Sequence, residues 1–406
     1  MNNDPRNSGQ RTGAVVCAAL LATLWAAGPA VAEDARQGVP HTAAGLSAEA
    51  GLEPFLGEPA FDVQPVFEGE RLPNVVVATD GTVLATWGWG TVRVRRSDDG
   101  GETWGPEIAL RQGLNSGGAV VDENTGHILV FTEEKHPPAP LHVLRSIDHG
   151  KTWVEQEVVI HPDEKGNVPS MCMNERGITL RHGEHAGRLL RPSRCYTGGN
   201  AREFWPQHYT NAVYSDDGGT TWHTSAPFPA NGTGEAALAE LTDGRIYYNS
   251  RRHLSTDGLN PRMRYIAHSD DGGVTWKDLS VSDVLPDGDQ HRDYGLMAGL
   301  VRLPVAGRDI LVFSNIVSPR GRHNGHVWAS FDGGRTWPIK RQVDEGPFAY
   351  SSLAAGRPET PSEGWIYLLY ETDGHPDSSG RIARFNLAWL LDGEPTGDGE
   401  VPEGDG

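Results

Sequence analysis

Cysteine, metal-binding patterns and basic residues are all scarce in this sequence of 406 residues. Only 3 cysteines occur, and none lies in a cysteine–histidine spacing typical of zinc sites, so we predict no metal and no cofactor. Lysine and arginine total 35 against 54 acidic residues, which gives a net charge of −19. Because the phosphates of nucleic acids repel such a chain, the charge argues against a nucleic-acid partner.

Long hydrophobic runs and helical periodicity are missing beyond the N-terminal region. No later segment is long and apolar enough to cross a bilayer, so we predict no membrane span. Short apolar runs alternate instead with turn residues, in a chain that contains 51 Gly and 28 Pro. This composition favours many short strands over long helices.

Residues 1–32 have the layout of an export signal. Arg6 and Arg11 supply a positive start, residues 14–27 are apolar, and Ala30-Val31-Ala32 matches a cleavage site. We therefore predict a cleaved signal peptide and a secreted or periplasmic protein. Cleavage would leave two cysteines, Cys172 and Cys195, and the sequence leaves open whether they form a disulfide.

One turn motif, S-x-D-x-G-x-T-W, occurs five times, beginning at Ser97, Ser146, Ser215, Ser269 and Ser330. Its aspartate can accept backbone N–H groups, and its glycine allows the positive φ of a tight turn. The copies recur about every 50–70 residues, a period typical of propeller blades.

These repeats predict an all-β fold, a six-bladed β-propeller of four-stranded antiparallel blades, in which one blade lacks the motif. The propeller is expected over residues 61–392, and residues 382–391 are expected to close it against the first strand. A loose lead-in at residues 33–60 and a disordered acidic tail at residues 393–406 complete the predicted domain organisation.

Four stretches between the repeats carry polar residues that strand packing does not require. They are Glu70-Arg71-Leu72-Pro73; Glu235 with the later Asn249-Ser250-Arg251; Arg320-Gly321-Arg322; and Ala349-Tyr350-Ser351 with Leu369-Tyr370-Glu371. In order and spacing, these motifs resemble those of the sialidase (neuraminidase) superfamily across about residues 61–391. The resemblance implies a six-bladed propeller whose repeated turns lie on the face away from the active site.

The resemblance also implies a role for each matched residue. Arg71, Arg251 and Arg322 would clamp a substrate carboxylate, with Arg320 as a nearby competitor of Arg322, and Glu371 would hold Arg71. Tyr350 would be the nucleophile and Glu235 the base that takes its proton. Arginine suits this role because its guanidinium forms charge-assisted, often bidentate bonds to carboxylates. A neutral phenol, unlike a carboxylate nucleophile, is not repelled by an acidic sugar.

The expected function is a retaining exo-glycosidase that releases terminal sialic acid, or a related acidic sugar, from glycans. Its partner would be a glycan that carries a carboxylate; the oligomeric state is not predicted. Two alternatives stay open: a propeller hydrolase or lyase acting on another carboxylated sugar, such as a uronate, and a non-catalytic carbohydrate-binding propeller.

One feature departs from the family pattern. Residues 84–96, where the resemblance implies a loop with an acid/base aspartate, contain no Asp, Glu or His, and Trp87 and Trp89 stand there instead. The donor of the leaving-group proton is therefore unidentified. Residues 287–293 and 205–209 are two possible sources; otherwise the leaving group needs no proton, or the substrate has changed or the activity has been lost.

Overall fold

The computed structural model describes residues 49–254, 263–289, 295–375 and 378–396. The chain divides into two compact units, residues 1–39 and 40–406, and every described residue belongs to the second. The predicted signal peptide therefore lies outside the described residues and stays a prediction. Among the described residues, no helix has the length and apolar character needed to cross a membrane.

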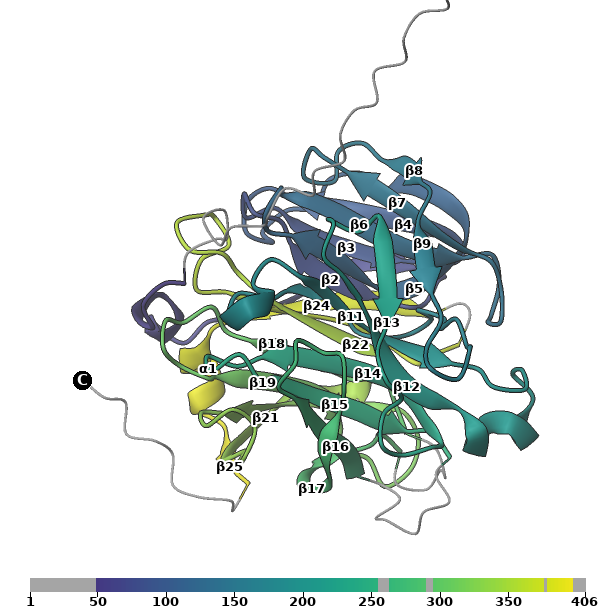
Figure 1. Ribbon diagram of the computed structural model, residues 1–406. Coiled ribbons are helices and arrows are strands. Elements are labelled where there is room, and N and C mark those ends of the chain that lie inside the picture. The colour runs from purple at the N-terminus through teal and green to yellow at the C-terminus, as the bar shows by residue number, and fades with distance from the viewer. Residues whose placement is uncertain (1–48, 255–262, 290–294, 376–377, 397–406) are drawn as a thin grey trace, which may run out of the picture. The chain divides into compact units, whose positions relative to one another are not determined.

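The described residues form five β-sheets, almost entirely antiparallel (Figure 1). One contains, in order, β1 (Phe61–Glu68), β24 (Ser379–Phe385), β23 (Ile366–Glu371) and β22 (Ser351–Ala355). The next contains β2 (Asn74–Val77), β3 (Val83–Trp87), β4 (Trp89–Ser97), β5 (Ile108–Asp122), β6 (His127–Glu133), β7 (Leu141–Ser146) and β8 (Val154–Gln156).

The third sheet contains β10 (Ile178–Thr179), β11 (Leu189–Cys195), β12 (Tyr209–Ser215), β13 (Thr221–Thr224) and β9 (Val159–His161), the last pairing parallel to β13. The fourth contains β14 (Thr233–Glu240), β15 (Ile246–Arg252), β16 (Met263–Ser269) and β17 (Lys277–Pro286). The fifth contains β18 (Gly299–Arg302), β19 (Leu311–Ile316), β20 (His323–Ser330), β21 (Ile339–Pro347) and β25 (Glu394–Pro395).

The sheets have a propeller-like arrangement, which confirms the all-β prediction. Their inner strands contact one another in a closed series, β2 to β22, β18, β14, β11, β5 and back to β2. The predicted six separate four-stranded blades are not found among the described residues. Four sheets have four or five strands, and the fifth has seven.

The count differs because β5 is 15 residues long and belongs to two groups of strands. Its residues 108–114 pair with β4, and its residues 114–122 pair with β6, with an irregularity between Asn115 and Ala119. A single continuous strand thus joins what the repeats predicted as two blades. The repeats could not predict this, because the turn motifs mark turns but carry no information on strand continuity.

The repeated turns have the hydrogen bonds that their sequence predicts. In the third copy, Ser215 Oγ donates to Asp217 Oδ1 at 2.8 Å, and Asp217 Oδ1 accepts from the Thr221 N–H at 2.9 Å. The Gly219 N–H donates back to Ser215 Oγ at 2.9 Å, and the same three bonds recur in the other four copies.

Parts of the segments that flank the predicted propeller form regular structure, contrary to expectation. Phe55, in a 3-10 helix at Glu53–Leu56, is only 2% exposed, so part of the predicted loose lead-in packs into the core. β24 pairs with β1, as predicted, but Leu387–Leu391 forms the helix α1. Glu394–Pro395, placed in the predicted disordered tail, pairs with β21 as β25. Two further 3-10 helices occur, Gly183–His185 and Arg202–Gln207.

Candidate active site

The six predicted site residues lie within strands or in the segments just before them, in four of the five sheets, and they meet at one end of the strands. In an antiparallel sheet, the start of one strand lies beside the end of the next. Thr233 at the start of β14 accordingly pairs with Arg252 at the end of β15, whereas Ser269 of the fourth turn pairs with Ile246 at the other end. The turns and the site thus lie at opposite ends of this sheet.

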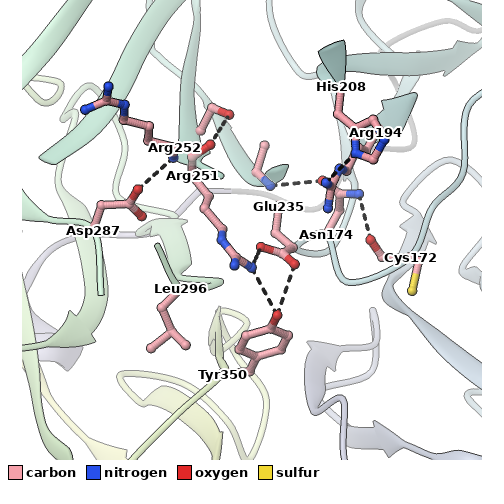
Figure 2. A network of polar contacts seen from close by, with 12 residues as sticks. Cys172, Asn174, Arg194, His208, Glu235, Arg251, Arg252, Asp287, Leu296 and Tyr350 are labelled. Carbon is pink, nitrogen blue, oxygen red and sulfur yellow. Dashed lines mark hydrogen bonds and ion pairs between the residues drawn. The ribbon is translucent and has the colours of Figure 1, made fainter. Parts of the chain in front are cut away.

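Tyr350, immediately before β22, forms the centre of the site (Figure 2). Its hydroxyl donates to Glu235 Oε1 at 3.0 Å and accepts from Arg251 Nη1 at 3.1 Å. Arg251 Nη1 also pairs with Glu235 Oε2. All three side chains are buried, with 1–4% exposure, so these bonds act with little screening by water.

Burial and neighbouring charges shift the pKa values of Tyr350 and Glu235 in opposite directions. Burial, followed by the charge of Glu235, raises the pKa of Tyr350 above its ordinary value. Burial acts to raise the pKa of Glu235 as well, but the charges of Arg251 and Arg194 outweigh it and lower that pKa. Glu235 is therefore an anion and Tyr350 a neutral phenol at neutral pH, the states that a base and a nucleophile need before reaction.

Arg71 lies on one side of the Tyr350 ring and is held by Glu371. Its Nε and Nη2 donate to the two oxygens of the Glu371 carboxylate at 3.1 and 2.6 Å. Glu371, at the end of β23, is fully buried and also accepts from the Leu72 N–H at 3.2 Å. The Arg71 guanidinium lies 5.2 Å from the centre of the Tyr350 ring and 5.6 Å from that of Trp89.

Arg322, immediately before β20, approaches Tyr350 as well. Its guanidinium carbon lies 5.2 Å from the ring centre, the same distance as that of Arg71. Among the described residues, none forms a hydrogen bond or ion pair with this guanidinium. A Cβ atom on Gly374 would collide with Arg322 Nη1, so glycine at this position leaves room for the side chain. Arg320, the predicted competitor, is exposed.

Comparison with known proteins identifies the family. The BNR repeat-like domain family matches residues 88–359, about two thirds of the chain. The chain belongs to the sialidase superfamily of BNR-repeat proteins. It is 31% identical to a sialidase from Micromonospora viridifaciens over 91% of this chain and 59% of the relative, and 27% identical to one from Bacteroides fragilis over 74% and 60%. It thus spans about three fifths of the length of these two curated relatives.

A solved structure agrees with this assignment. A Hadza microbial sialidase superposes with a TM-score of 0.60 and 25% sequence identity, over 79% of this chain and 66% of that one. The propeller-like arrangement of sheets is therefore shared with a sialidase of known structure.

Sequence reasoning missed a second group of residues behind Glu235 in this sialidase-family site. Arg194, 2% exposed on β11, bonds through Nη2 to His208 Nδ1 at 2.8 Å, and its charge helps to lower the pKa of Glu235. Asn174 Oδ1 accepts from the Ala236 N–H at 2.9 Å and so fixes β14 next to the catalytic candidate (Figure 2). Neither residue belongs to a motif, so no sequence signal indicated it.

The two segments suggested as proton donors do not present a free acid among their described residues. Asp287 is buried, and its oxygens accept from Arg264 Nη1 at 2.8 Å and from the Arg252 N–H at 2.7 Å. His208 is fully buried, and burial together with Arg194 lowers its pKa to about 4. Asp289 is also buried, and its Oδ2 accepts from the Gly321 N–H at 2.7 Å. Residues 290–293 of the first segment lie outside the described residues.

The two cysteines are both buried and free, which answers the question that the sequence left open. Burial raises the pKa of each thiol. Among the described residues, no group of three or more His, Cys, Asp or Glu side chains is arranged to hold a metal ion.

Proposed function

We propose that this protein is a retaining exo-glycosidase that releases a terminal acidic sugar, sialic acid or a close relative, from glycans. The observation that carries the proposal is the Tyr350 phenol, hydrogen-bonded to Glu235 and surrounded by the guanidiniums of Arg71, Arg251 and Arg322. Support also comes from the relatives, since the proteins from M. viridifaciens and B. fragilis are named sialidases.

The three arginines would bind the sugar carboxylate. Three cations close together repel one another, so the free protein needs counter-charges: Glu371 supplies one to Arg71 and Glu235 one to Arg251. Arg322 has no such anion among the described residues. An incoming carboxylate would therefore gain most from Arg322, which is the guanidinium with its charge uncompensated.

Tyr350 would attack the anomeric carbon while Glu235 takes its phenolic proton. The existing 3.0 Å bond already points that proton at the Glu235 carboxylate. A phenol is suited to this substrate because a carboxylate nucleophile would be repelled by the carboxylate of the sugar, and sialidases with a tyrosine nucleophile are known. Water then cleaves the tyrosyl–sugar bond, so that the product keeps the configuration of the substrate.

The test is a screen of the purified protein against sialosides and uronate-capped oligosaccharides, with Tyr350→Phe as the inactive variant and Tyr214→Phe as its matched control. The half-buried Tyr214 lies at the end of β12 that leads into the third turn, away from the site, and stacks on His223. We expect sialoside cleavage by wild type and Tyr214→Phe, and loss of cleavage in Tyr350→Phe.

The other outcomes separate the alternatives. Cleavage of uronate-capped glycans alone would replace sialic acid by a uronate as the substrate. Binding of an acidic glycan that is equally strong in wild type and Tyr350→Phe, without turnover of any substrate, would make the protein a carbohydrate-binding propeller.

A further inference from the structure

A retaining glycosidase must give a proton to the departing sugar oxygen, and the proposed function leaves this donor open. The carboxylates closest to Tyr350 are already engaged: Glu235 would act as its base, and Glu371 is held by Arg71. The donor must lie near Arg71 and Tyr350, and must also face the space that receives the leaving group.

His136, in the segment between β6 and β7, has this position. Its ring centre lies 6.3 Å from that of Trp89, and the Trp89 ring also contacts the Arg71 guanidinium at 5.6 Å. On its other side the ring meets Tyr196 edge-on at 5.9 Å. The half-buried His136 is thus one aromatic ring away from the proposed carboxylate clamp.

The hydrogen bonds of His136 leave one nitrogen for a substrate. Nδ1 lies 3.3 Å from the Pro137 carbonyl oxygen, and because a carbonyl only accepts, Nδ1 carries a hydrogen and donates to it. Nε2 has no hydrogen-bond partner within the described part of the chain. When the ring is protonated, the Nε2 hydrogen is therefore the one that can be given away.

A groove of about 550 Å³ opens beside this ring. Trp89 and His136 line it, together with the polar side chains of Arg111, Gln112 and Lys135. An indole flanked by hydrogen-bond donors suits a neutral sugar ring, whose apolar face stacks on an aromatic side chain while its hydroxyls accept hydrogen bonds. Trp89 lines this groove and also contacts the Arg71 guanidinium. The bond between a sugar in the groove and a sugar held by Arg71 would therefore pass close to His136.

Other acids near this position are less suited. Glu133, three residues earlier, is 1% exposed, and its two oxygens accept from Ser170 Oγ at 2.6 Å and Ser116 Oγ at 2.9 Å, so it faces the interior. Glu134 lines the groove but is exposed and pairs with His142 at 3.2 Å.

We propose that His136 is the acid/base residue of this site and that the groove lined by Trp89 and His136 binds the leaving sugar. This inference rests on the proposed glycosidase function. In the first step, the Tyr350 oxygen bonds to the anomeric carbon, its proton passes to Glu235, the glycosidic C–O bond breaks, and the leaving oxygen takes the Nε2 proton of the His136 imidazolium. In the second, water attacks the anomeric carbon and gives its proton to His136, while the Tyr350 oxygen leaves and recovers its proton from Glu235.

The charges around His136 set the pH range of this step. Burial, together with the positive charges of Arg194 and Arg71, lowers the pKa of His136 below its ordinary value, against the Pro137 carbonyl and the Glu235 carboxylate, which act to raise it. The other charged residues that line the groove with His136 are Arg111, Glu134 and Lys135. The imidazolium is therefore populated only at acidic pH, and kcat/KM for a sugar leaving group should fall as the pH rises through this pKa.

The test compares two substrates with His136→Ala: sialyllactose, whose leaving sugar needs a proton, and a 4-nitrophenyl sialoside, whose leaving phenolate needs none. For sialyllactose we expect kcat/KM to fall about 100- to 10,000-fold, the usual contribution of a general acid. For the nitrophenyl substrate kcat/KM should change less than about tenfold, while kcat falls because the second step has lost its base. With the nitrophenyl substrate, kcat/KM should no longer fall as the pH rises through the pKa of His136.

His161→Ala is the matched control, because His161 is exposed on the outer strand β9 and stacks on His223. It should behave as wild type with both substrates. Equal losses of kcat/KM on both substrates in His136→Ala, or no loss on either, would overturn the assignment while leaving the proposed function intact. Wild-type protein that cleaves neither substrate would instead overturn the proposed function, and the role of His136 with it.

Discussion

The hydroxyl of Tyr350 donates a 3.0 Å hydrogen bond to Glu235, a residue 115 positions earlier in the chain. Arg251 Nη1 contacts both partners, so the phenol, carboxylate and guanidinium form a buried triangle. The titration of Tyr350 and that of Glu235 are therefore linked, since the charge of each changes the electrostatic energy of the other.

Substitution of Glu235 should change both activity and the titration of Tyr350. The Glu235→Gln variant loses the proposed base, so we expect kcat/KM to fall about 100- to 10,000-fold. The charge of Glu235 is also one cause of the raised pKa of Tyr350, so that pKa should fall in the variant. Ultraviolet titration of Glu235→Gln, with and without Tyr350→Phe, isolates this phenol. An unchanged phenol titration would show that the two groups are not coupled.

Arg322 should contribute to substrate binding but little to stability. Its guanidinium has no anionic partner among the described residues, so Arg322→Ala breaks no ion pair found there. We expect KM for a sialoside to rise about 10- to 100-fold, as for loss of a charge-assisted bond, with an unchanged melting temperature. Arg320→Ala, two positions away and exposed, is the control and should keep the wild-type KM. Equal effects of the two variants would contradict the assignment.

Glu371 should contribute strongly to stability. It is fully buried and binds Arg71 through both oxygens, so Glu371→Gln leaves the Arg71 charge without its partner. Loss of one member of a buried ion pair costs about 3 kcal/mol in the free energy of unfolding. Urea denaturation measures this cost, and the exposed Glu345→Gln on β21 is the control. A difference below about 0.5 kcal/mol between the variants would mean that the ion pair contributes nothing net.

The aspartates of the repeated turns should make the stability of the fold depend on pH. Although burial acts in the opposite direction, hydrogen bonds from Thr152 and Ser146 lower the pKa of Asp148 to about 2. A carboxyl whose pKa is lower in the folded than in the unfolded state, where it is about 3.9, stabilises the fold fully above pH 4. That contribution disappears as the pH falls from about 4 to about 2.

Asp148→Asn should therefore be less stable than wild type at pH 6, and its disadvantage should shrink toward pH 2. Thermal unfolding at a series of pH values measures the effect. Asp283→Asn, at an exposed position of β17, serves as the control. A disadvantage of Asp148→Asn that is constant with pH would refute the role of this carboxylate charge.

Cys172 and Cys195 should both be found as thiols. They are buried and free, so an alkylating reagent should modify them only after the protein is unfolded. Peptide mass mapping of folded and denatured samples tests this. A peptide pair joined by a disulfide would contradict the structure.

Local patterns predicted those parts of this protein that depend on neighbouring residues. The five turns formed as expected, because Ser215, Asp217 and Thr221 and their equivalents bond to one another within a few residues. The predicted number of blades was wrong because strand length was not encoded in those turns: β5 continues through residues 108–122 and joins two groups of strands.

The six site residues were predicted from a family resemblance in the order and spacing of motifs, and their side chains do converge. Two neighbours of these residues were not predicted: Arg194 behind Glu235, and His136 beside Trp89, belong to no motif.

The sequence by itself determined the strand-rich composition, the turn chemistry and the residue types available for binding an acidic sugar. Only the tertiary structure decided which of those residues share a buried space, that the two cysteines stay apart, and which histidine lies next to Trp89 and a groove. The physical reason is that burial and charge at each position are set by strands distant in the chain, and pairing across sheets leaves no local pattern in the sequence.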